Sequence, residues 1–310
     1  MTPTFVTADA AAELNWHDAV EALRAGHRGA APEIGDLFLG PAEATLLTRA
    51  AHVPGLGFGV KSVTVRPDNP AAGRPSVQGA MFVFDPETGA LSAVIDSALV
   101  TRLKTAADSV LGATLLARPE SRRLLIVGAG AVAASLIEAY PALFPDLERI
   151  EVWARRPEQA EALVAAAAAG GAAELGVATD LEAAAGAADI VATATMARTP
   201  VLRGAWIRPG THVDLIGAFR ADMREADDAL IAGGRLFVDS RETVLGHIGE
   251  LAIPIAEGVI DADHVRADLR ALVADPDIGR QGPEDVTVFK NGGGAHLDLM
   301  IAAWIARTIG

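Results

Sequence analysis

A short glycine-rich segment carries the clearest chemical signal in the sequence. Residues 124–133 read LLIVGAGAVA, an apolar run followed by the spacing G-x-G-x-x-A. In this spacing the first glycine permits a tight turn, the second lets the backbone approach a pyrophosphate, and the small third residue lets a helix pack on a strand. A helix that begins after the glycines directs unpaired N–H groups at the phosphates. A glycine turn that binds nothing is disfavoured because the pattern fits on both sides. The segment predicts a dinucleotide-binding turn made by Gly128, Ala129, Gly130, Ala131 and Val132.

The residues after the next predicted strand indicate which dinucleotide would bind. Residues 152–157 read VWARRP, with no Asp or Glu to accept hydrogen bonds from a ribose 2′-hydroxyl. Arg155 and Arg156 stand there instead, and a guanidinium can bind a 2′-phosphate in a fork and stack on adenine. NADP(H) is therefore favoured over NAD(H). For either arginine alone, a side chain that points into solvent remains an alternative.

Two further groups of residues fall at the carboxyl ends of predicted parallel strands, where ligands of open α/β sheets bind. They are Thr193, Ala194 and Thr195 in the first group and Ile216 and Gly217 in the second. A threonine hydroxyl at such a place can contact the ribose or the nicotinamide. Ordinary capping of the strand end is an equally good reading of any one of these threonines.

The elements that would position these residues differ between the two parts of the chain. Asn15 is a candidate cap for a helix that runs to about Gly26. Strands are predicted over residues 55–65, 77–84 and 91–95, and a helix over residues 97–117. This first part is therefore a mixture of helices and strands.

From residue 122 strands alternate with helices. Strands are predicted at residues 124–127, 149–153, 189–194, 212–216, 236–239 and 286–289. One helix stops near Pro141, and the next spans residues 157–169 and ends at Gly170 and Gly171. The alternation predicts a parallel sheet of the α/β class. A last helix, residues 295–309, follows three glycines that would let it return to the first part.

Composition limits the classes of function. A length of 310 residues suits two domains, and the absence of cysteine excludes disulfides, thiolate metal sites and cysteine nucleophiles. The net charge of −14, without a basic stripe, argues against a nucleic-acid partner. The seven histidines form no pattern of metal ligands, so no metal is expected.

The start of the chain lacks the pattern of a signal peptide. The apolar tract at residues 162–173 is too short for a membrane span and predicts a buried helix. A cytoplasmic protein is expected.

The chain resembles the ornithine cyclodeaminase/μ-crystallin family over nearly its whole length. The resemblance rests on KSVTVRPDN (residues 61–69), TRLKTAA (101–107), GAG (128–130), ADIVATAT (188–195) and PGTHVDLIGA (209–218). It implies a Rossmann dinucleotide-binding domain, residues 121–291, inserted into an α+β domain for substrate binding and dimerisation. That second domain comprises residues 1–120 and 292–310, and a homodimer is implied.

The resemblance also assigns residues to the reaction. Lys61 matches the family's active-site lysine, which can bind a substrate carboxylate or move a proton. Lys104 matches the position of an arginine that clamps the substrate carboxylate, although a surface lysine is a serious alternative. Thr105 resembles a cofactor contact. Lys290, His296 and Asp298 lie in a closing motif near the nicotinamide, where Asp298 can equally be a favourable residue at a helix start. The expected catalytic residues are Lys61, Lys104 and Asp298, and Lys290 is expected to contact the cofactor.

Departures from the family narrow the expected reaction. Cyclodeaminases carry an aspartate shortly after the Gly217 position, where this chain has Phe219 and Arg220. The arginine often found near residues 32–35 is also absent. The resemblance therefore favours an NAD(P)H-dependent oxidoreductase that reduces a ketimine or cyclic imino acid by hydride transfer to C=N, in reverse an amino-acid dehydrogenase of amino-acid metabolism. Two alternatives stay open: an ornithine-cyclodeaminase-like ammonia lyase, and a non-catalytic μ-crystallin-like protein that binds NADP(H) and a ligand.

Overall fold

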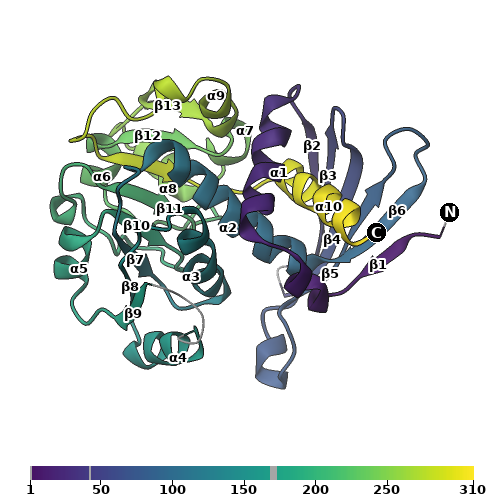
Figure 1. Cartoon of the computed structure of the whole chain (residues 1–310), viewed down its shortest axis with the longest axis horizontal. Helices are drawn as coiled ribbons and strands as arrows, with labels where there is room; N and C mark the ends of the chain where they lie inside the picture. The colour runs from purple at the N-terminus through teal and green to yellow at the C-terminus, as the bar shows by residue number, and fades with distance from the viewer. Residues whose placement is uncertain (1, 42, 168–172) are drawn as a thin grey trace. The chain divides into compact units, whose positions relative to one another are not determined.

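The chain forms two compact units, whose course can be followed in Figure 1. The structure, a computed structural model, describes residues 2–41, 43–167 and 173–310. Unit 1 comprises Met1–Ala107 and Gly294–Gly310, and unit 2 comprises Asp108–Gly293. The division falls inside helix α2 (Ser97–Leu116), before the boundary after residue 120 that we expected from the sequence.

Unit 1 is a six-stranded sheet with helix α10 (Ala295–Ile309) packed on one face, and helix α1 (Trp16–Arg28) packs against α10. Its strands follow the spatial order β1 (Thr4–Val6), β6 (Leu91–Asp96), β5 (Val77–Phe84), β4 (Gly57–Val65), β3 (Thr45–Val53) and β2 (Glu33–Leu39). The β1–β6 pair is parallel and the other pairs are antiparallel. Short 3-10 helices lie at η1 (Ala8–Glu13) and η2 (Asn69–Ala72).

The alternation of side chains along β4 determines which residues face the helices. Gly57, Gly59, Lys61 and Val63 are buried, whereas the residues between them are more exposed. A Cβ at Gly59 would lie 2.7 Å from the Leu299 side chain of α10, so this buried row faces α10. Because successive strand residues point to opposite sides, Lys61 belongs to the covered face.

Unit 2 is an eight-stranded sheet in which every pairing is parallel. Its spatial order is β13 (Val265–Asp268), β12 (Arg235–Val238), β14 (Thr287–Lys290), β11 (His212–Leu215), β10 (Ile190–Thr193), β7 (Arg123–Val127), β8 (Arg149–Trp153) and β9 (Glu174–Val177). The order of strands along the chain reverses between β7 and β10. Such a switch point is where open α/β sheets bind ligands, outside the carboxyl ends of the strands.

Short helices connect these strands. They are α3 (Ala131–Leu143), α4 (Pro157–Ala167), α5 (Leu181–Ala187), α6 (Asp228–Gly233), α7 (Arg241–Val244), α8 (Gly249–Ala256) and α9 (Leu269–Ala274), with 3-10 turns η3 (Gly204–Trp206), η4 (Ala262–His264) and η5 (Pro276–Ile278). In the part of the chain that the structure describes, no helix has the length and apolarity needed to cross a membrane.

The predicted fold class is confirmed: a Rossmann-type parallel sheet is inserted into an α+β unit. The cap of α1 is confirmed too, because the Asn15 side chain accepts a hydrogen bond from the Asp18 amide at 2.9 Å. Strands β1, β2, β3, β9 and β13 were not predicted. Helix α3 continues to Leu143 with Pro141 inside its last turn, and Gly170 and Gly171, the expected end of α4, lie outside the described residues.

The prediction of a buried helix in the alanine-rich tract is wrong for the part that the structure describes. Ala160 is the buried residue of α4, whereas Ala162 is exposed and Leu163 is partly exposed. The strand next to α4 is β9, at the edge of the sheet, so the helix has little sheet to cover it.

Candidate active site

The glycine loop has the geometry that the sequence predicts for a dinucleotide-binding turn. Gly128 follows β7 with a φ of +126°, a conformation that side chains rarely adopt. Its amide donates to the Trp153 carbonyl at 2.8 Å, and a Cβ here would lie 2.5 Å from the Ala194 carbonyl oxygen. At Gly130 a Cβ would meet nothing within 4 Å. The loop is therefore tight at its first glycine and open at its second.

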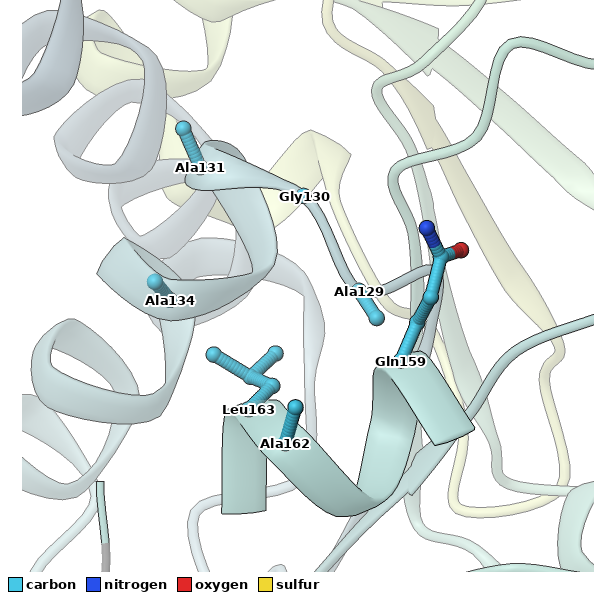
Figure 2. A pocket seen from close by; sticks show the side chains of 7 residues that line it. All are labelled: Ala129, Gly130, Ala131, Ala134, Gln159, Ala162 and Leu163. Atoms are coloured by element: carbon cyan, nitrogen blue, oxygen red, sulfur yellow. The ribbon is translucent and has the colours of Figure 1, made fainter. Parts of the chain in front are cut away.

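An open hollow of about 430 Å³ lies beside this loop. Figure 2 shows its walls, which come from the loop, from the first turns of α3 and from one side of α4. They are lined by Ala129, Gly130, Ala131, Ala134, Gln159, Ala162 and Leu163. Gly130 begins α3 without a side-chain cap, so the first N–H groups of this helix are directed at the loop. Free N–H groups, open space at Gly130 and apolar walls fit a pyrophosphate with an attached nucleoside.

Arg155 and Arg156 lie in the bend between β8 and α4, and both side chains are exposed. Neither makes an ion pair with any residue that the structure describes. The Arg156 carbonyl accepts a hydrogen bond from the Gln159 amide at 3.0 Å, which attaches the bend to the start of α4. Two guanidinium groups are thus presented where the ribose of a bound dinucleotide would be recognised.

The carboxyl ends of β10 and β11 are joined by a buried carboxylate. Glu225 accepts hydrogen bonds from the Thr195 amide at 2.7 Å, from the Thr195 hydroxyl at 2.8 Å and from the Gly217 amide at 2.6 Å. A Cβ at Gly217 would lie 2.0 Å from the Thr195 carbonyl oxygen, so this close approach requires glycine. By contrast, the buried Thr193 hydroxyl has no hydrogen-bond partner among the described residues. Of the predicted threonines, Thr195 therefore shapes the loop, and the Thr193 side chain is fully buried.

Lys290 lies at the centre of a charged cluster inside unit 2. Its side chain is fully buried and donates to the carbonyls of Leu215 at 2.9 Å and Asn291 at 2.6 Å. Burial lowers the pKa of this ammonium, while four buried acids oppose the shift. These acids are Glu250, Glu225, Asp239 and Asp214. The Lys290 ammonium thus binds the backbone at the ends of β11 and β14. Lys290 can therefore affect a cofactor only through the backbone that it positions.

Sequence reasoning missed the acids of this cluster. Glu250 accepts from the amides of Glu225 at 2.8 Å and Ala226 at 2.9 Å. Burial raises the pKa of Glu250, and the nearby Glu225 raises it further. Burial also raises the pKa of Asp214 to about 7, although the Tyr140 hydroxyl donates to this carboxyl at 3.1 Å. Glu250 lies 25 and 24 residues from Glu225 and Ala226, and Asp214 lies 74 residues from Tyr140, so no local pattern identifies these two acids.

The predicted catalytic residues belong to unit 1. Lys61 of β4 and Asp298 of α10 form a buried ion pair, in which the ammonium is 2.7 Å from the carboxylate oxygens and donates a hydrogen bond to Oδ1. Lys61 is 7% exposed and Asp298 is 1% exposed. Burial alone raises the pKa of the Asp298 carboxyl, but the charges of Lys61, Lys104 and Arg49 together lower it below its ordinary value. The alternative of a solvated lysine at position 61 is thus contradicted.

Lys104 and His296 complete the surroundings of this pair. Lys104 is 7% exposed, which contradicts the alternative of a surface helix lysine. His296 precedes Asp298 on α10, and its ring lies edge-on to His27 of α1, with 6.0 Å between ring centroids. Burial, followed by the charges of His27 and Lys104, lowers the pKa of His296 to about 3, so its ring is neutral at pH 7. Thr105 is half-buried on α2 beside Lys104. No group of side chains within the described ranges has the composition of a metal site.

The sequence matches the model of the ornithine cyclodeaminase/mu-crystallin family over residues 21–309. The chain belongs to this family. The resemblance inferred from its motifs is confirmed, and the match includes the glycine loop, the lysines at positions 61 and 104, and the Asp298 motif.

Relatives within the family indicate the reaction. A Delta(1)-pyrroline-2-carboxylate reductase of Paracoccus denitrificans is 61% identical over 99% of this chain and 97% of its own. The solved structure of the Thermococcus litoralis Delta(1)-pyrroline-2-carboxylate reductase in complex with NADH and L-proline is 28% identical, with a TM-score of 0.90 and coverage of 98% of this chain and 97% of that one. An archaeal alanine dehydrogenase dimer with bound NAD has the same identity and TM-score, with coverage of 99% and 96%.

These relatives confirm the predicted class. The chain is a nicotinamide-dependent oxidoreductase that acts on a C=N bond, and the expected imine reduction is favoured over the lyase and binding alternatives.

Proposed function

We propose that this chain reduces Δ1-pyrroline-2-carboxylate to L-proline, with NADPH as its preferred hydride donor. The observation that carries the proposal is the 61% identity, over 99% of the chain, to a reductase of that substrate. The buried Lys61–Asp298 pair of unit 1 and the open glycine loop of unit 2 support it, because they supply a proton donor and a nucleotide site in one chain.

Unit 2 holds the cofactor in this proposal. Gly128, Ala129, Gly130, Ala131 and Val132 surround the pyrophosphate, and the Thr193 hydroxyl binds the ribose or the nicotinamide. Ala194, Thr195, Ile216 and Gly217 provide the strand ends against which the nicotinamide lies. Their shape depends on Glu225 and Lys290, so Lys290 acts on the cofactor through the backbone. Thr105 is a further proposed contact, contributed by α2.

The preference for NADPH rests on Arg155 and Arg156. Two exposed guanidinium groups with no acidic neighbour between residues 154 and 157 attract a 2′-phosphate, and hydrogen bonds to it are charge-assisted. An acid at this place, which would favour NADH, is absent from the sequence.

The chemistry assigned to unit 1 is proton transfer and substrate binding. Reduction of an imine needs a hydride at its carbon and a proton at its nitrogen, and the bound nicotinamide supplies the hydride. Lys61 is the proposed proton donor to the nitrogen, directly or through a water, and protonation makes the imine carbon more electrophilic. Asp298 is a positioning residue, because it holds the Lys61 ammonium within 2.7 Å and balances its charge. Lys104 supplies a cation for the substrate carboxylate.

The outer face of the unit 1 sheet is the proposed dimer interface. Leu37, Leu39, Leu46 and Phe58 lie on the face opposite Lys61, and each is at least 36% exposed. Exposed apolar surface of this kind marks an interaction site. We expect a homodimer in the cytoplasm, with twice the chain mass of 31.9 kDa by light scattering. Leu37→Asp/Phe58→Asp should yield a folded monomer, whereas a persistent dimer would contradict this interface.

The reaction is tested by following NADPH and NADH consumption with a panel of cyclic imino acids and of 2-oxo acids with amines. We expect Δ1-pyrroline-2-carboxylate to oxidise NADPH much faster than NADH. Lys61→Met should bind NADPH as the wild type does and lose about 100- to 10,000-fold in turnover. Silence across the panel with tight NADPH binding would contradict the proposed reaction, and equal rates with both nucleotides would contradict the proposed preference.

A further inference from the structure

Of the described residues that line the hollow beside the glycine loop, Gln159 alone has a polar side chain. The others are glycine, alanine or leucine. Figure 2 shows the Gln159 side chain extending from the first turn of α4 alongside Ala129 of the loop. Its amide group makes no hydrogen bond with any group in the described ranges. The wall of the hollow that α4 provides therefore presents a hydrogen-bonding group that is available to a ligand.

The place of Gln159 follows from the pairing of β7 with β8. These strands are parallel, with Val127 beside Trp153, so the turns that follow them lie at the same edge of the sheet. Helix α4 starts from the second of these turns. Gln159 shares one face of this helix with Ala162 and Leu163, which follow it at spacings of three and four residues. That face forms one wall of the hollow.

Arg155 and Arg156 directly precede this wall. The backbone amide of Gln159 donates to the Arg156 carbonyl at 3.0 Å, so the two residues belong to one hydrogen-bonded turn. The side chains of all three residues are exposed. Glu158, the acid next to Gln159 in the chain, is not among the residues that line the hollow. The turn thus presents two cations and a neutral amide to the same region.

The chemistry of an amide suits both forms of the nucleotide. Its N–H groups donate to a 2′-phosphate in charge-assisted hydrogen bonds, and its oxygen accepts from a ribose 2′-hydroxyl. A glutamate has nearly the same shape, but its ionised carboxylate only accepts hydrogen bonds and repels a phosphate. Exchange of glutamine for glutamate therefore changes the charge that the ribose meets and leaves the shape of the wall unchanged.

We propose that Gln159 donates a hydrogen bond to the 2′-phosphate of NADPH and is a specificity-determining residue for the nucleotide. The inference rests on the proposed preference for NADPH and extends the site from the bend at Arg155 and Arg156 to the first turn of α4. The hollow then takes the 2′-phosphate between this turn and the glycine loop.

Other roles of Gln159 predict different results. A side chain that only interacts with solvent would leave the binding of both nucleotides unchanged when it is replaced. A contact with the adenine or the pyrophosphate, which NADPH and NADH share, would change the binding of both alike. Only a contact with the 2′-phosphate separates the two nucleotides.

The test measures the dissociation constants of NADPH and NADH by fluorescence titration without any imine, so it is independent of the proposed reaction. Gln159→Glu should weaken NADPH binding by about 10- to 100-fold and leave NADH binding within about threefold. Gln159→Leu should weaken NADPH binding by about 3- to 20-fold, as expected for one lost hydrogen bond to a charged group at an exposed place. Gln159→Lys should strengthen NADPH binding at least about threefold, because it adds a point charge for the phosphate. Such a gain cannot result from damage to the fold.

Ala165→Glu is the matched control. It adds the same charge as Gln159→Glu to an exposed position of α4 that is not among the lining residues. Its effect on NADPH binding should stay within about threefold, because salt screens exposed charges that do not touch the ligand.

The outcomes distinguish this proposal from the proposed preference. Equal weakening of NADPH and NADH binding in Gln159→Glu, or no weakening of either, would overturn the role of Gln159. A wild type that binds both nucleotides equally would contradict the preference for NADPH. In that protein, a loss of NADPH binding alone in Gln159→Glu would still support the contact between Gln159 and the 2′-phosphate.

Discussion

Substitution of Asp298 by Asn tests the buried ion pair of unit 1. Asparagine has nearly the shape of aspartate and lacks its charge, so the Lys61 ammonium would stay buried without its counter-ion. The two side chains are 8% and 1% exposed, which gives the ammonium little access to water. The charges of Lys104 and Arg49 aggravate the loss, because both act on the same carboxylate.

The expected loss in the free energy of unfolding follows from the distance between the two charges. At the observed 2.7 Å, two unit charges attract one another by about 6 kcal/mol at an effective dielectric constant of about 20. Measured losses on breaking one side of a buried pair are about 3–5 kcal/mol, because desolvation offsets part of the attraction. We expect Asp298→Asn to lower the free energy of unfolding of unit 1 by about 3–5 kcal/mol. Lys61→Met/Asp298→Asn should recover part of this loss, since it removes both charges.

The assay is urea unfolding followed by tryptophan fluorescence. The chain has four tryptophans, and in a Trp153→Phe/Trp206→Phe background the remaining two, Trp16 and Trp304, both report on unit 1.

The pH dependence of the stability gives a second test of the ion pair. The pKa of Asp298 is lower in the folded state than its ordinary 3.8, so the pair stabilises the fold above that pH and loses its effect as the pH falls further. The gap between wild type and Asp298→Asn should be constant from pH 5 to 8 and narrow below about pH 4. A cost below about 1 kcal/mol, or a double variant less stable than Asp298→Asn, would refute the reasoning.

Three further predictions concern unit 2. Gly128→Ala places a Cβ 2.5 Å from the Ala194 carbonyl oxygen, at a φ of +126° that side chains rarely adopt. NADPH binding, measured by fluorescence titration, should therefore weaken at least about 10-fold. Unchanged binding would contradict the tight-turn geometry. The double variant Arg155→Ser/Arg156→Ser should raise KM for NADPH by about 10- to 100-fold and leave KM for NADH nearly unchanged. An equal effect on both nucleotides would contradict recognition of the 2′-phosphate by these arginines. Burial raises the pKa of Asp214 to about 7, so the protonated form that stabilises the fold is lost as the pH rises from about 4 through 7. Asp214→Asn should therefore become more stable relative to the wild type over that range, as measured by calorimetry. A difference in stability that does not change with pH would count against the raised pKa.

The sequence predicted those features whose cause is local. The strand, the glycine turn and helix α3 lie within 21 consecutive residues, and the tight turn at Gly128 follows from its own backbone. The Asn15 cap depends on a contact three residues away. Such features leave a pattern in the sequence because the interacting groups are neighbours in the chain.

Strand β2 shows why other elements were missed. It is an edge strand whose residues are mostly exposed, and Leu37, Phe38 and Leu39 follow one another without alternation. The usual period of two is produced by burial on one face, which this edge strand lacks. Arg49 of β3, whose charge acts on Asp298, was overlooked with it, since its neighbours Asp36 and Lys61 are set by strand register.

The charged cluster of unit 2 was missed for a related reason. In the sequence, Glu225 lies among other charged residues and has the appearance of a solvated surface acid. Its function appears when the chain brings it to Thr195, 30 residues earlier, and to Gly217. Lys61 and Asp298 are 237 residues apart, so the resemblance to a family identified them where spacing alone did not.

Transfer of deuterium from [4-²H]NADPH tests the central claim most directly. The chain is incubated with Δ1-pyrroline-2-carboxylate and nucleotide deuterated on the transferred face, and the product is analysed by mass spectrometry and NMR. The account predicts proline with one deuterium at Cα, one NADP⁺ formed per proline, no release of ammonia, and loss of this product with Lys61→Met. Proline without deuterium, or proline formed from ornithine with ammonia and no net consumption of nucleotide, would contradict it.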